Sequence, residues 1–155
     1  MSIMEYFGLS DAAAESELVQ AYEKMKSGFY DGLFLKGKEG RDAADNMTRL
    51  EESYSEAKGF IINRDFCEGN ADITAMINRA IASNDVYELQ TRLDAVIEKT
   101  AFWHYVEAVA FYIKKLYFDA MEHLRQAVLL SDRNVKYAKA LFRLEEKILM
   151  ESAND

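Results

Sequence analysis

Apolar residues recur at intervals of three and four along most of this chain, which is the spacing of a helix with one apolar face. The first such stripe consists of Leu18, Tyr22, Met25 and Phe29. The second stripe, which stops at Gly59, consists of Ala43, Met47, Leu50, Tyr54 and Ala57. Two helices whose stripes face each other predict an antiparallel hairpin, with Ser10 or Asp11 capping the first helix.

Glycine separates the two predicted helices. The segment Lys26–Asp42 holds four of the chain's seven glycines, and the chain contains no proline. Because glycine lowers helix stability, this segment is predicted to be a loop. The short segment before the hairpin supplies Tyr6, Phe7 and Leu9, which are expected to pack across both helices. The chain therefore opens with a predicted three-helix unit.

One pattern occurs twice in the second half of the chain. "INRAIASNDVYELQTRLDAVI" and "AVAFYIKKLYFDAMEHLRQAV" superimpose with an offset of 31 residues, and each predicts helix, short turn, helix. The matched positions are Ala80, Leu89, Leu93 and Val96 in the first copy and Phe111, Ala120, Leu124 and Ala127 in the second. The turns are predicted at Ser83–Asp85 and Lys114–Asp119, where each aspartate is expected to accept from amides of the next helix.

Three motifs of the first unit carry a family resemblance: "YFGLS", "ESELVQAYEKM" and "MTRLEESYSEA". Together they resemble, over residues 5–58, the J-domain of DnaJ-like co-chaperones. That family has an Ala-Tyr pair in its second helix, here Ala21 and Tyr22. Its third helix carries an aromatic or apolar residue, an apolar residue three positions later, and then an Ala-Tyr pair whose tyrosine comes four positions after that. The corresponding residues here are Met47, Leu50, Ser53 and Tyr54. The resemblance implies a J-domain-like three-helix fold.

The motif by which that family stimulates its partner heat-shock ATPase, His-Pro-Asp, is absent from this chain. The family's spacing places it on Tyr30, Asp31 and Gly32. The second helix of a J-domain is basic where it docks on the ATPase. The corresponding helix here contains only two basic residues, Lys24 and Lys26, and four acidic residues, Glu15, Glu17, Glu23 and Asp31. Charge complementarity is missing, so stimulation of a heat-shock ATPase is not expected.

The second copy of the repeat resembles a tetratricopeptide repeat. The matching positions are Ala108, Phe111, Ala120, Leu124 and Ala127, with Tyr117 ahead of Ala120. The departures are His104, Glu107 and Asp132. The last segment, "SDRNVKYAKALFRLEEKI", resembles a capping helix, with a stripe formed by Tyr137, Leu141, Leu144 and Ile148. The whole arrangement resembles bacterial J-domain proteins with a short tetratricopeptide-like tail.

These patterns predict an all-α protein in three parts. Residues 1–58 are expected to form a J-domain-like three-helix unit without His-Pro-Asp, and residues 59–70 a linker. Residues 71–155 are expected to form tetratricopeptide-like helical hairpins followed by the capping helix.

Composition narrows the classes of partner. The chain has 155 residues, a formal net charge of −8 and a pI near 4.9, with no evident basic stripe, which argues against nucleic acid or an anionic membrane as partner. The start, "MSIMEYFGLSD", resembles neither a signal peptide nor a membrane anchor. A single cysteine, Cys67, is compatible with a reducing compartment. A cytoplasmic location is therefore expected.

No pattern predicts catalysis, a metal or a cofactor. His104 and His123 are nineteen residues apart, with no Cys-x-x-Cys or His-x-x-x-His partner. Cys67 lies in the expected linker without an adjacent base, and no Gly-Lys-Ser/Thr follows the glycines to make a phosphate loop. The protein is therefore not expected to be an enzyme.

The segment "AFWHYVEAVAFYIKKLYF" predicts a helix that is apolar around most of its circumference. Either neighbouring hairpins bury it, or part of it meets a partner protein or a second copy through Trp103, Tyr105 or Tyr112. The resulting hypothesis is a non-catalytic protein-binding or scaffold protein, a degenerate relative of J-domain co-chaperones. Two alternatives stay open: a helical domain that binds a small molecule or lipid among these aromatics, and an active co-chaperone with a divergent loop.

Overall fold

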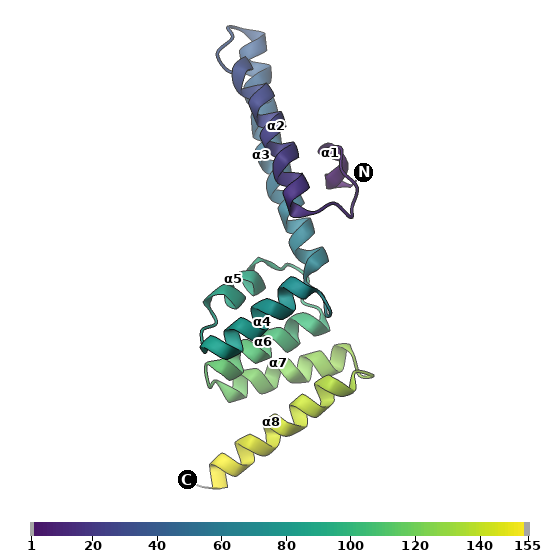
Figure 1. Cartoon of the computed structure of the whole chain (residues 1–155), viewed down its shortest axis with the longest axis vertical. Coiled ribbons are helices and arrows are strands. Elements are labelled where there is room, and N and C mark those ends of the chain that lie inside the picture. Colours follow the sequence, from purple (N-terminus) through teal and green to yellow (C-terminus); the bar gives the residue numbers. More distant parts are fainter. Residues whose placement is uncertain (1, 154–155) are drawn as a thin grey trace. The chain divides into compact units, whose positions relative to one another are not determined.

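The computed structural model describes residues 2–153, and its regular secondary structure in that range consists of eight α-helices, with no strand (Figure 1). They are α1 (Ile3–Tyr6), α2 (Glu15–Gly32), α3 (Lys38–Asp65), α4 (Ala71–Ser83), α5 (Tyr87–Ala95), α6 (Ala101–Ile113), α7 (Tyr117–Leu130) and α8 (Val135–Ala153). The predicted all-α class is confirmed.

The chain divides into two units, Met1–Ile62 and Asn63–Asp155. The prediction that the second long helix stops at Gly59 is wrong, because α3 continues to Asp65. Its extension places Ile61, which is 3% exposed, in the core of the first unit. Of the predicted linker 59–70, only residues 66–70 connect helices, and Gly69 adopts a φ of 91° there.

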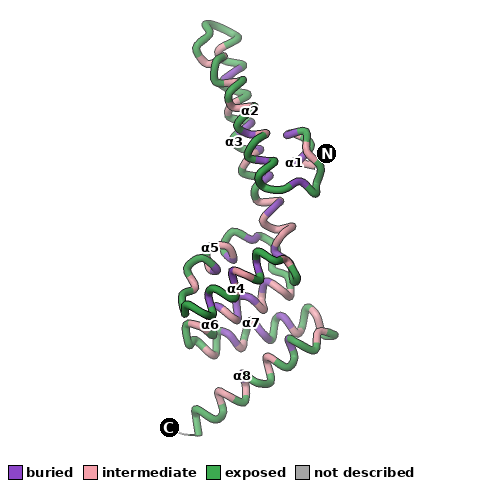
Figure 2. The backbone as a smooth tube through the Cα atoms, viewed as in Figure 1, coloured by how far each residue is buried: buried purple, intermediate pink, exposed green. Residues whose placement is uncertain are grey.

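The first unit is built on the hairpin of α2 and α3, which run side by side in opposite directions (Figure 1). The rings of Tyr22 and Tyr54 stack with centroids 3.9 Å apart, and the Tyr22 hydroxyl donates to the Glu51 carboxylate. Leu18 and Leu50 are fully buried between the helices (Figure 2). The helical stripes therefore face each other, as their spacing predicts.

The short helix α1 packs on this hairpin. Met4 is fully buried and Phe7 nearly so, while Tyr6 and Leu9 are partly buried against the same core. Neither Ser10 nor Asp11 caps α2, because that helix begins at Glu15 with Ala14 as its N-cap and no side-chain cap. The predicted capping residues lie in the connection before it.

The tip of the hairpin is tighter than the glycines suggest. Tyr30, Asp31 and Gly32 form the last turn of α2, and only residues 33–37 connect it to α3, so the predicted loop at Lys26–Asp42 is wrong in extent. A Cβ at Gly32 would lie 2.9 Å from the Cβ of Ala43. A Cβ at Gly40 would lie 2.1 Å from the backbone oxygen of Leu35. These two glycines allow close approach of backbone segments rather than marking a long loop.

Alanine substitutions at two glycines should change stability in opposite directions. Gly40→Ala is expected to lower the free energy of unfolding by about 1–3 kcal/mol, because the new methyl group meets backbone. Gly28→Ala should raise it by about 0.5–1 kcal/mol, because Gly28 lies within α2 and a Cβ added there would meet nothing within 4 Å. Urea unfolding of the two variants measures both effects, and a stabilising Gly40→Ala would contradict the packing at the tip.

The second unit contains two helical hairpins, α4 with α5 and α6 with α7, followed by α8. In the second helix of each hairpin the buried positions are 31 residues apart: Leu89, Leu93 and Val96 match Ala120, Leu124 and Ala127. In the first helix they are 30 apart: Ile73, Met76 and Ala80 match Trp103, Val106 and Ala110. Ala80 therefore corresponds to Ala110, which is fully buried, and not to Phe111 as predicted.

Because the first helices of the two hairpins are offset by 30 residues and the second helices by 31, the second hairpin contains one additional residue, which lies at the end of α6. The N-caps of the first helices, Asn70 and Thr100, are 30 residues apart, and each accepts from an amide three residues on. The residues with left-handed backbone in the turns, Asn84 (φ 58°) and Lys115 (φ 64°), are 31 residues apart. The second turn spans only residues 114–116, so Asp119 lies inside α7 and does not cap it as predicted.

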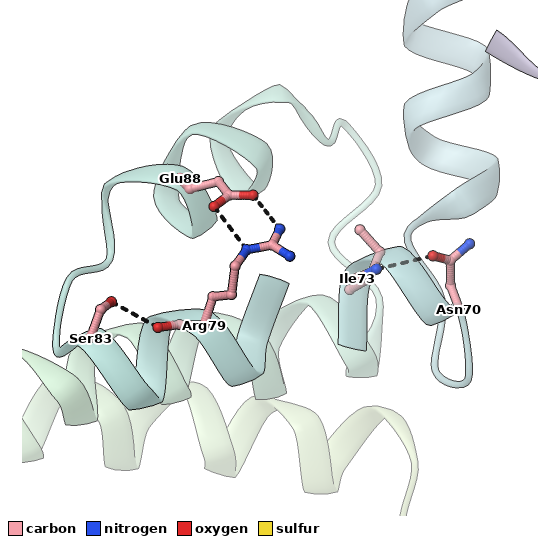
Figure 3. A network of polar contacts seen from close by, with 5 residues as sticks. All are labelled: Asn70, Ile73, Arg79, Ser83 and Glu88. Atoms are coloured by element: carbon pink, nitrogen blue, oxygen red, sulfur yellow. Dashed lines mark hydrogen bonds and ion pairs between the residues drawn. The ribbon is translucent and has the colours of Figure 1, made fainter. Parts of the chain in front are cut away.

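Polar contacts hold the first hairpin of this unit (Figure 3). The Arg79 guanidinium on α4 pairs with the Glu88 carboxylate on α5, with Nη2 and Oε1 2.6 Å apart, and this pair lowers the pKa of Glu88. The Asn70 side chain accepts from the amide of Ile73 at the start of α4. Asp85 accepts from the amide of Tyr87, as its place before α5 predicts.

Helix α8 packs on α6 and α7 through one side. Leu144 is buried with Ala108, Ala120 and Leu124, and Leu141 and Ile148 lie partly buried against that cluster. Tyr137 is 2% exposed. The four residues of the predicted capping stripe thus all lie on the packed side of α8.

Candidate functional site

The three aromatic residues predicted to meet a partner have different environments. Trp103 is only 8% exposed, and its indole Nε1 donates to the backbone oxygen of Leu93 at 3.0 Å. Its side chain belongs to the internal packing of the second unit, so its predicted contact with a partner is corrected. Tyr105 is half-buried and stacks on Tyr137, whereas Tyr112 is 45% exposed. Tyr105 and Tyr112 line one groove.

This groove has a volume of about 480 Å³ and lies among α6, α7 and α8, with the end of α4 at its edge. Alanines from all three helices line it: Ala108, Ala120 and Ala140. Tyrosines add three larger walls, namely Tyr105, Tyr112 and Tyr117. Small side chains between large aromatic ones leave a hollow where a fully packed helix array would have none. We call it the tyrosine groove.

A second hollow of about 440 Å³ continues the tyrosine groove along α8. The two share Tyr105, Ala140 and Arg143. The second hollow adds Val135, Lys136 and Lys139 to the lining.

Every charged residue that lines the two hollows is basic. They are Lys115, Lys136, Lys139, Arg143 and Lys147. The chain as a whole carries 27 acids against 19 Lys and Arg, so this cluster opposes the overall charge. Lys136 pairs with Glu68 and Lys147 with Glu151, while the other three basic residues form no ion pair among the described residues. This excess of positive charge along the hollows favours anionic ligands.

Four of these basic residues form a stripe along α8 at intervals of three and four: Lys136, Lys139, Arg143 and Lys147. The expectation that the chain has no basic stripe is therefore wrong. Lys147 lies near the rings of Tyr112 and Tyr117, and their interactions, followed by that of Glu151, raise its pKa. Within residues 2–153, neither Lys115 nor Arg143 forms an ion pair, so both keep their charge available to a ligand.

The residues predicted for repeat packing come together in the same unit. Ala120 and Ala127 are fully buried, Ala108 and Leu124 nearly so, and Phe111 is partly buried. Ala108, Ala120 and Leu124 also line the tyrosine groove, so the packing of α6 on α7 forms its wall.

The positions of the degenerate motif lie in the other unit, at the tip of the α2–α3 hairpin. Tyr30 is 52% exposed and its ring meets the edge of Phe34, which is 74% exposed. Gly32 faces Ala43.

The two histidines, which sequence spacing does not connect, form a pair between α6 and α7. The Nδ1 atoms of His104 and His123 are 3.0 Å apart, and the rings stack with centroids 5.3 Å apart. Phe111 stacks on the other side of His123. One Nδ1 must carry a hydrogen and the other a lone pair, so the bond exists only while at least one ring is neutral.

Burial lowers the pKa of His104, and the nearby charges of His123 and Lys99 lower it further. In the unfolded chain His104 titrates near 6.5, so below that pH the unfolded state binds more protons than the folded one. The stability that depends on neutral His104 is therefore full above 6.5 and is lost as the pH falls through the lower pKa of the folded state.

Acidification should weaken the fold through this pair. Between about pH 7.5 and about pH 5.5, the free energy of unfolding should fall, and the fall should be smaller in His104→Phe. Val106→Ala is the control, because it should create a cavity in the same helix and lower the free energy of unfolding without changing how that energy depends on pH. Denaturant unfolding at both pH values measures this, and an unchanged pH dependence in His104→Phe would contradict a role for the pair.

The described residues offer no metal centre, because none of their clusters contains three or more histidine, cysteine, aspartate or glutamate side chains suited to a metal ion. Cys67 is exposed and unpaired by disulfide. Within residues 2–153, no helix combines the length and the apolar character that crossing a bilayer requires.

No family model, no curated protein and no solved structure matches this chain. The tyrosine groove is the site whose chemistry is most specific. Sequence analysis identified two of its tyrosines but missed Lys115, Arg143 and Lys147. The spacing of the basic residues in α8 is the signal that could have found part of that set.

Proposed function

We propose that the protein is a non-catalytic binding protein whose second unit holds an acidic segment of another protein in the tyrosine groove. The observation that carries this proposal is that all the charged residues lining the groove and its extension are basic, in a chain of net charge −8. A peptide that brings a carboxylate to Arg143 and an apolar side chain to the alanine-lined floor would satisfy both features of the site.

The architecture supports a scaffold rather than an enzyme. Tyrosine and arginine are enriched at protein interfaces, because their large side chains combine apolar area with hydrogen-bonding groups. Tyr105, Tyr112 and Arg143 supply this combination along one groove. Tyr105 packs against the cluster formed by α6, α7 and α8, so its ring would need little ordering on binding.

The first unit is proposed to be a J-domain relative without ATPase-stimulating activity. Tyr22, Leu50 and Tyr54, which match the family, lie together in its core. The positions that would carry His-Pro-Asp are Tyr30, Asp31 and Gly32, and these belong to the last turn of α2. A cytoplasmic location is part of the proposal, supported by a single exposed cysteine that has no disulfide partner in the chain.

A small molecule or lipid is the second candidate occupant of the groove. Its volume of about 480 Å³ lies within the range of small-molecule sites. Such a ligand would carry a negative charge, because the same basic residues would face it.

Acidic peptides should bind the second unit through charge. A peptide with glutamates flanking one leucine or tryptophan is expected to bind, with affinity that falls as salt is added. Arg143→Glu should weaken binding about tenfold or more, because it reverses a charge in both hollows. Fluorescence anisotropy of labelled peptides measures the affinity.

The matched control for that experiment is Lys24→Glu, which makes the same change of charge on an exposed position of α2. It should leave peptide affinity unchanged. Equal binding of acidic and neutral peptides would contradict the proposal. A thermal shift with anionic metabolites, in the absence of any peptide binding, would assign the groove to the second candidate instead.

The first unit should not stimulate a heat-shock ATPase. Purified protein, added to such an ATPase from the same host, is expected to leave the rate of ATP hydrolysis unchanged, because the His-Pro-Asp motif is absent. An intact J-domain protein serves as the positive control in the same assay. Stimulation that disappears in Asp31→Ala would support the divergent co-chaperone and overturn this part of the proposal.

A further inference from the structure

The outward face of α8 carries an exposed apolar stripe. Val135 and Phe142 are each 63% exposed and Leu149 is 70% exposed. They are seven residues apart, so two helical turns separate each from the next and all three lie in one line. The opposite side of α8 is the packed one, with Tyr137 and Leu144 buried. The stripe therefore remains uncovered by the described residues.

Charges beside this stripe change sign along the helix. Lys139 and Glu146, also seven residues apart, are both exposed on the same side as the stripe. Neither forms an ion pair among the described residues. Glu145 precedes Glu146 and is half-buried. The stripe thus has a positive flank before Phe142 and a negative flank after it.

This order makes the face complementary to itself in one orientation. If two α8 helices cross antiparallel at Phe142, Val135 of one copy faces Leu149 of the other, because each is seven residues from the crossing point. Lys139 of each copy then lies beside Glu146 of the other copy, because both residues are on the same flank of the stripe. In a parallel pair the two-fold axis would run along the helices and would place the flank with Lys139 and Glu146 on opposite sides of the contact in the two copies, so these two residues would not meet.

We propose that a second copy of this chain covers the outward face of α8, forming a two-fold symmetric antiparallel dimer centred on Phe142. The two-fold axis repeats each contact, so two lysine–glutamate pairs flank one apolar line. Ala138, a small exposed residue next to the stripe, allows the two helices to approach. A membrane surface is the less suitable occupant, because an interfacial helix carries basic residues on both flanks of its apolar face. Val135 and Lys139 also line the second hollow, so the dimer face adjoins it there, but no residue of the stripe lines the tyrosine groove itself.

The oligomeric state tests the dimer. Sedimentation velocity over about a thousandfold dilution should show a dimer that dissociates into monomers. Phe142→Glu should be monomeric throughout, since it places two carboxylates at the axis. Tyr87→Glu is the control, because Tyr87 is another exposed aromatic residue, 78% exposed, and it lies on α5. A wild-type monomer at every concentration would overturn the proposal.

Charge reversal tests the orientation without disturbing the apolar line. Lys139→Glu and Glu146→Lys, each alone, should raise the dimer dissociation constant about tenfold by placing like charges opposite each other. The double variant should return to within about threefold of the wild type, because it restores both pairs with the signs exchanged. Equal weakening in the single and double variants would show that these two residues do not face each other.

Cysteine crosslinking tests the register. In a Cys67→Ser background, which removes the exposed native thiol, Phe142→Cys should form a disulfide-linked dimer under mild oxidation. Val135→Cys and Leu149→Cys should crosslink when mixed but not separately. Crosslinking of Val135→Cys with itself would indicate a parallel pair and overturn the antiparallel arrangement.

Discussion

The packing of the second unit and the groove within it depend on small alanine side chains at the place where α6, α7 and α8 pack together. Ala108, Ala120 and Ala140 bring one small side chain from each helix to the same place. Ala108 and Ala120 let α6 and α7 approach closely, while the tyrosines at neighbouring positions lie at the edge of this contact. The same residues therefore hold the helices together and leave the groove between them.

The distribution of charge gives that groove its chemical character. An acidic chain with scattered lysines would repel anions, but here the basic residues of α8 and Lys115 surround one hollow. Helix α8 thus presents a packed side with Tyr137 and Leu144, a basic side towards the groove and an outward apolar stripe. Val135 and Lys139 lie where the basic side meets the stripe. One helix accounts for core packing, the proposed peptide site and the proposed dimer contact.

The helical class, the facing stripes of the first hairpin and the repeat in the second unit can be predicted from the sequence alone, because they follow from the local spacing of apolar residues. The sequence did not determine the role of Gly32 and Gly40, since a glycine in a loop and a glycine at a close contact look alike in sequence. Nor did it separate Trp103, which is buried, from Tyr112, which is exposed, because both occur on a helix that is apolar nearly all round.

Which residues meet across helices depends on how the helices pack, and the sequence alone does not predict it. His104 and His123 pair because α6 packs on α7, and Lys115 joins Arg143 and Lys147 because the turn before α7 lies beside α8 at the groove. Contacts of this kind depend on the separation of helices in space, which the spacing of residues along one helix does not specify.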